Sequence, residues 1–236
     1  MRKALMLIFI LALPSGLAYR LPGQDPDPLA QPVGGFDLQN QTVVDGLAKI
    51  RAPRQPAFSV EFPLKKDLND RPLDNHLISA HINAGSLRNV LDQLIALDSR
   101  YTWSAYKRTI NVYPQSVAAA GKNYLLNRKI AKFDFTKASD PSELIFKTVS
   151  LLPGTREQIA FLGTGPLGNF DNPWTATFAN LSIREILDEL AEHLCSDCGW
   201  TFGGADNFRV IQFHERLLPE NPRPTQTEGK NSQNSH

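Results

Sequence analysis

The chain lacks most features that would identify an enzyme or a nucleic-acid-binding protein. Its 236 residues carry 25 basic and 24 acidic side chains, and a net charge of +1 is too small to neutralise a phosphate backbone. Neither of the hydrolase patterns G-x-S-x-G and H-E-x-x-H occurs, and there is no paired-carboxylate constellation. We therefore expect a non-enzymatic protein that needs no cofactor and binds no nucleic acid.

Long apolar runs are also missing, apart from one at the N-terminus. Ala4 to Leu13 follows the basic pair Arg2-Lys3, and Gly16 and Ala18 are the small residues expected before a cleavage site. This run is shorter than the roughly 20 residues that span a bilayer. We predict a signal peptide over residues 1–18, cleaved after Ala18, and an exported, periplasmic mature chain without a transmembrane segment.

Cysteine is scarce, and the two cysteines, Cys195 and Cys198, lie three positions apart. A local disulfide is the simplest interpretation of such a pair in an exported chain. A redox-active pair is an alternative, but it would need a helix N-terminus, and this pair follows a predicted helix. A zinc site completed by His193 and His214 is a second alternative.

The sequence does contain an internal repeat. Ser182-Ile183-Arg184-Glu185-Ile186-Leu187-Asp188-Glu189-Leu190 matches Ser86-Leu87-Arg88-Asn89-Val90-Leu91-Asp92-Gln93-Leu94, with the Ser, Arg, Leu, Asp and final Leu identical. The apolar spacing of both stretches is that of an amphipathic helix, and Ser182 with Glu185 forms a predicted capping box. Arg184 and Asp188, like Arg88 and Asp92, are predicted to be surface charges paired four residues apart. We infer a duplicated unit.

Each copy is predicted to have the order β-α-β followed by β-α-β-β. This order indicates an α+β fold of two tandem small domains, with mixed sheets and helices packed on one face. Proline- and polar-rich segments at both ends are predicted to be disordered. The predicted divisions are a lead-in over 19–35, a first domain over 36–114, a connector over 115–132, a second domain over 133–214 and a tail over 215–236.

The first copy resembles a known family. Phe36-Asp37-Leu38-Gln39-Asn40-Gln41-Thr42-Val43-Val44-Asp45-Gly46-Leu47 is similar to the opening of the short N-terminal domain shared by secretins and TonB-dependent signalling receptors. The resemblance covers Phe36 to Pro114, and Phe133 to His214 looks like a diverged second copy. It implies an exported protein–protein contact module, an adaptor that binds another protein of the bacterial cell envelope.

Two places are candidates for binding. Strand addition to an open sheet edge is a common way to recognise a protein, and the predicted edge carries Thr109, Ile110, Asn111 and Val112. The rival hypothesis is binding of a small ligand or cell-wall glycan by the loop Gly163 to Trp174, with Phe170 and Trp174 as a stacking surface. The G-x-G-x-x-G match within this loop leads into Asn, Asp and Pro rather than a helix, so it is a weak dinucleotide signal.

Overall fold

The structure of the chain is a computed structural model that describes residues 27–63, 76–138, 141–150, 158–163, 174–205 and 208–217. The predicted signal peptide, Phe170 and residues 164–168 of the G-x-G-x-x-G match lie outside the described residues. Among the described residues, no helix is long and apolar enough to cross a membrane.

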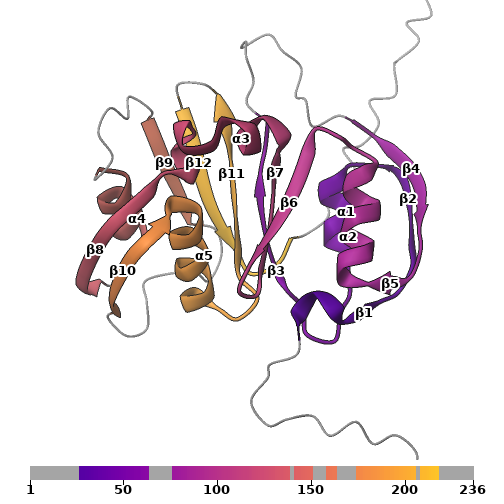
Figure 1. The fold of residues 1–236 in the computed structure, drawn as a ribbon, viewed down its shortest axis with the longest axis horizontal. Coiled ribbons are helices and arrows are strands. Elements are labelled where there is room, and N and C mark those ends of the chain that lie inside the picture. The colour runs from indigo at the N-terminus through magenta and orange to yellow at the C-terminus, as the bar shows by residue number, and fades with distance from the viewer. Residues whose placement is uncertain are drawn as a thin grey trace, which may run out of the picture.

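The fold is α+β, and the same order of elements occurs twice, as the repeat predicts (Figure 1). The first unit contains β2 (Phe36–Gln41), α1 (Val43–Lys49), β3 (Ala57–Glu61), β4 (Ile78–Ile82), α2 (Leu87–Ala96), β6 (Tyr101–Tyr106) and β7 (Thr109–Pro114). The second contains β8 (Lys129–Ala138), α4 (Pro141–Ser150), β9 (Gln158–Gly163), β10 (Trp174–Ser182), α5 (Ile183–Leu194), β11 (Gly199–Ala205) and β12 (Phe208–His214).

Capping residues fix where the helices begin. The predicted box at α5 is confirmed: Ser182 Oγ accepts from the Glu185 amide at 3.2 Å, and the Glu185 carboxylate accepts from the Ser182 amide at 2.6 Å. Thr42 and Asp45 make an equivalent box at α1. These bonds satisfy amides that the first helical turn leaves without partners.

In the first unit the helices pack between two sheet layers. Strands β2 and β4 form a two-stranded antiparallel sheet on one side of α1 and α2, and β3, β7 and β6 lie on the other (Figure 1). Gly46 allows the two helices to approach closely, because a Cβ at this position would lie 2.5 Å from Leu94 Cδ1. A residue that lowers helix propensity is therefore explained by the packing of the core.

The two units share one six-stranded sheet, whereas the repeat predicts a separate small sheet in each unit. Its order is β6-β7-β3-β11-β12-β9, and β3 pairs with β11 in parallel, with Val60 opposite Thr201 and Glu61 opposite Phe202. The outer strand β3 of the first unit thus meets β11, the second-unit counterpart of β6. This contact is head-to-tail, so β6 and β9 are the two ends of the sheet.

The helices of the two units cover opposite faces of this sheet. Phe58 and Val60 of β3 point into the first core, together with α1 and α2. The alternate residues Ser59 and Glu61 point to the other face, where α5 lies. Strand β3 is therefore buried on both faces, even at the polar positions of its alternating pattern.

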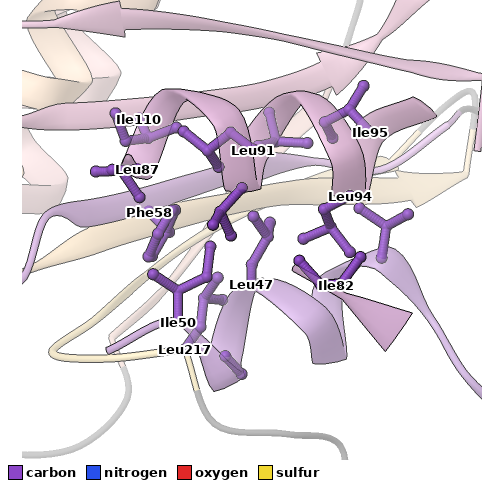
Figure 2. Close-up of a cluster of buried hydrophobic side chains, with 14 of the residues drawn as sticks. Leu47, Ile50, Phe58, Ile82, Leu87, Leu91, Leu94, Ile95, Ile110 and Leu217 are labelled. Carbon is purple, nitrogen blue, oxygen red and sulfur yellow. The ribbon is translucent and has the colours of Figure 1, made fainter. Parts of the chain in front are cut away.

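The two segments predicted to be disordered contribute to the first core. Leu29, in the 3₁₀ turn Pro28–Ala30, and Val33, in β1 (Pro32–Val33), are buried, and β1 pairs with β5 (Gly85–Ser86). Leu217 packs against the same core (Figure 2). The prediction is wrong for these described parts of 19–35 and 215–236, because a few well-placed apolar side chains outweigh a proline-rich composition.

The predicted connector is largely helical. It forms α3 (Gln115–Ala120) and two 3₁₀ turns, Gly121–Asn123 and Leu125–Asn127. Leu125 and Leu126 are buried in the core of the second unit, so the connector is part of that unit's packing.

Gly199 tests the contact between β3 and β11. A Cβ at this position would overlap the carbonyl oxygen of Phe58, which belongs to the backbone and cannot rotate away. We expect Gly199→Ala to lower the free energy of unfolding by about 1–3 kcal/mol, measured by urea denaturation. Gly34→Ala is the control, because no atom lies within 4 Å of its added Cβ. Equal effects of the two substitutions would contradict this account of the contact.

Candidate functional site

The strand predicted as a binding edge is an internal strand. Strand β7 lies between β6 and β3, and its residues Thr109, Ile110, Asn111 and Val112 are all buried. It pairs with β6 in an antiparallel hairpin that turns at Lys107 and Arg108. The assignment of the edge is wrong because β3, which is distant in sequence, covers the other side of β7.

Trp174 contributes to packing in the second unit. Its ring stacks on His193 at a centroid distance of 4.0 Å and meets Phe135 edge-on at 4.9 Å. Its partner in the ligand hypothesis, Phe170, lies outside the described residues. The indole therefore has aromatic partners within its own unit.

Cys195 and Cys198 form the predicted disulfide, which directly follows the C-terminus of α5. The two histidines of the zinc alternative are placed differently: His193 stacks on Trp174, and His214 is largely buried. In the described part of the chain, no group of three or more His, Cys, Asp or Glu side chains is placed to hold a metal ion.

Polar side chains are instead concentrated where the two units meet, under α5. Glu61 of β3 is fully buried, and Arg184 of α5 donates from Nε to its Oε1 at 2.6 Å. The Arg184 guanidinium also lies over the Tyr113 ring, with its Cζ 4.4 Å from the ring centroid. A strand of the first unit and a helix of the second thus share a buried ion pair.

Two further groups act on Glu61. Tyr124 and Arg209 are both close enough to stabilise its negative charge. Burial raises the pKa of Glu61, while Arg184, Tyr124 and Arg209 oppose the increase. Burial and the Glu61 charge together raise the pKa of the Tyr124 hydroxyl, which therefore remains a hydrogen-bond donor.

Asp188 occupies the centre of the same interface. Its carboxylate accepts from Asn111 Nδ2 at 2.7 Å, from Trp200 Nε1 at 2.8 Å and from Ser59 Oγ at 3.4 Å. Burial raises its pKa to about 7, although these donors favour the ionised form. Donors from β3, β7 and β11 therefore converge on one acceptor on α5.

The predicted surface pairing of Arg184 with Asp188 is therefore wrong. Both side chains point into the interface, and each binds residues of the first unit. Sequence periodicity places them on the polar face of α5, which is correct, but it does not reveal that a second face of the sheet covers them.

The first unit carries the same three residue types on its outer side. Trp103 Nε1 donates to Asp92 at 3.0 Å, and Arg88 lies over the Trp103 ring at 5.7 Å. Arg88 and Asp92 are exposed, unlike Arg184 and Asp188. No strand among the described residues pairs with the outer side of β6. We call this the α2–β6 surface, defined by Arg88, Asp92 and Trp103.

Comparisons with protein-family models, with curated proteins and with solved structures found no match to this chain.

The buried ion pair should contribute strongly to stability. Arg184→Met leaves Glu61 buried without its closest cation, so we expect the free energy of unfolding to fall by about 3 kcal/mol. Arg88→Met, at the exposed equivalent position, should change it by less than about 0.5 kcal/mol. Urea denaturation of both variants measures the difference, and similar losses would contradict the assignment.

Asp188 and His214 should give opposite pH dependences of stability. The pKa of Asp188 is raised from 3.8 to about 7, so its contribution to stability is complete at low pH and is lost as the pH rises through 7. Burial lowers the pKa of His214 from 6.5 to about 4, so its contribution is present above 6.5 and is lost as the pH falls through 4.

Single substitutions should separate these two effects. Between about pH 4 and 7, Asp188→Asn should make stability rise more steeply with pH than it does in the unsubstituted chain. His214→Gln should make stability rise less steeply with pH over the same range. Each slope should change by up to about 1.4 kcal/mol per pH unit, measured by urea denaturation across that range. Slopes that change in the same direction in both variants would exclude this assignment.

Proposed function

We propose that the chain is a non-enzymatic protein–protein interaction module, an exported adaptor of the bacterial cell envelope that binds a partner at a sheet edge. The observation that carries the proposal is the contact between β3 and β11, in which one unit recognises the outer strand of its homologous neighbour. Recognition through strand edges is therefore something this fold already does within a single chain.

The open ends of the sheet support the same proposal. Strand β6 ends the six-stranded sheet on one side. No described strand pairs with its outer edge, so the backbone groups there can pair with an added strand. The resemblance of Phe36 to Pro114 to the short N-terminal domains of secretins and TonB-dependent receptors is consistent with such a role.

The ligand-binding alternative has less support. It depends on Trp174 as a stacking surface, and the Trp174 ring already stacks on His193. The redox alternative depends on two cysteines that follow the C-terminus of α5, where the helix dipole does not stabilise a thiolate.

Site-specific photo-cross-linking tests the proposal. A photoreactive residue is placed in the full chain at Ala105, exposed on β6, or at Lys122, exposed on the connector, and each bait is irradiated in envelope extract. We expect one adduct of defined mass from the Ala105 bait, and excess unlabelled chain should compete it away.

An adduct from neither bait would contradict an interaction function. An adduct from Lys122 alone would retain that function but exclude β6 as the binding edge.

A further inference from the structure

The two units present the same docking surface, and only one of the two is covered. In the second unit Arg184, Asp188 and Trp200 contact β3 of the first unit. The α2–β6 surface repeats this residue set, down to the indole N–H that donates to the aspartate. Its cover is absent from the described residues, since β6 ends the sheet.

The covered copy defines what such a surface accepts. Strand β3 runs parallel to β11, and its Phe62 amide donates to the Phe202 carbonyl at 2.8 Å. Its Ser59 hydroxyl donates to Asp188, and Glu61 receives the guanidinium of Arg184. A suitable strand therefore offers a donor to the aspartate and, two residues later, a carboxylate to the arginine.

The α2–β6 surface has polar groups that can still bind a partner strand. Asp188 accepts from three side chains, whereas Asp92 accepts from the Trp103 indole in its own half of the repeat. Arg88 lies over the Trp103 ring and faces solvent, where Arg184 holds a buried carboxylate. An acceptor and a cation thus lie beside a strand edge with which no other described strand pairs.

We propose that the α2–β6 surface binds an extended strand of a partner protein, parallel to β6, with a hydroxyl or amide side chain facing Asp92 and a carboxylate facing Arg88. This inference rests on the proposed function and adds the chemistry of the partner. Apolar residues of the partner strand alternate with these polar ones, as Phe58 and Val60 do in β3 and Phe62 does directly after it.

Head-to-tail addition of a second copy of the chain, which would extend the six-stranded sheet, does not meet these requirements. The strand at its opposite sheet end, β9, contains no Asp or Glu between Gln158 and Gly163, so it has no carboxylate for Arg88. Its β3 strand is already covered by β11 and β7. The charge pattern therefore favours a different protein.

One sequence difference between the two repeats limits which β6 residues a partner strand can pair with. Thr102 replaces Gly199, the position where an added Cβ would overlap the carbonyl oxygen of the docked strand. The backbone of a partner strand therefore cannot approach β6 closely at Thr102, and the partner must pair with β6 from Trp103 to Tyr106.

The chain supplies its own probe, a fluorescent peptide of residues 57–63 (Ala-Phe-Ser-Val-Glu-Phe-Pro). Fluorescence polarisation with the intact, full chain should show saturable binding, and Arg88→Glu should weaken it by about tenfold. Arg54→Glu, at an exposed arginine near the start of β3, is the control and should leave the affinity unchanged. A peptide carrying Glu61→Lys should bind the Arg88→Glu chain better than the unsubstituted chain.

Each alternative outcome overturns the inference. Absent binding, or binding unaffected by Arg88→Glu, would show that the peptide does not use this surface; the second result would place it at β11 instead. Self-association of the chain that Arg88→Glu abolishes would identify a second copy as the occupant. If the peptide fails while the Ala105 bait still captures a partner, this inference fails and the proposed function stands.

Discussion

The ion pair between Glu61 and Arg184 is the interaction on which the arrangement of the two units depends. A carboxylate in the middle of a sheet is costly to desolvate unless a cation and further donors compensate for the lost water. Here α5 supplies the cation from the other unit, and Tyr124 and Arg209 add to it. The first unit alone would expose Glu61 and Ser59 on an open strand, so its outer edge is complete only when the second unit is docked. The continuous sheet and the burial of β3 on both faces follow from this requirement.

Duplication explains how such an interface could leave a second surface open. The arginine, aspartate and tryptophan that dock the second unit onto β3 also occur in the first unit, where the Trp103–Asp92 hydrogen bond is retained at the protein surface. A head-to-tail contact joins two different surfaces, so two homologous units leave one of these surfaces without its counterpart at each end of the sheet. The surface at the β6 end carries Arg88 and Asp92, whereas β9, at the other end, has no acidic residue that could pair with Arg88. The two ends of the sheet are therefore chemically different, and the β6 end is suited to a partner that is not a copy of the chain.

Much of the local structure could be predicted from the sequence, because helices and hairpins are specified by nearby residues. The capping box at Ser182, the hairpin around Lys107 and the repeat all have local signals. The interface could not be predicted in the same way, since Glu61 and Arg184 are far apart in the chain and periodicity does not report which polar face is covered. Phe58 and Val60 of β3 alternate with Ser59 and Glu61, a pattern typical of a strand with one side in solvent, but here the interface covers the polar side. The recurrence of arginine and aspartate at an offset of 96 residues, and of tryptophan at an offset of 97, was the one sequence signal of a shared surface. The contacts of the buried copy show what the exposed copy can bind.

The central claim is that β3 and β11 join the two units into one sheet. The most direct measurement is native-state hydrogen exchange of the Phe62 amide, which donates to Phe202 across the interface. The account predicts that this amide is protected to a degree similar to that of the amides in the centre of β7. Rapid exchange at Phe62, with both cores still protected, would show that the units fold separately and would contradict the claim.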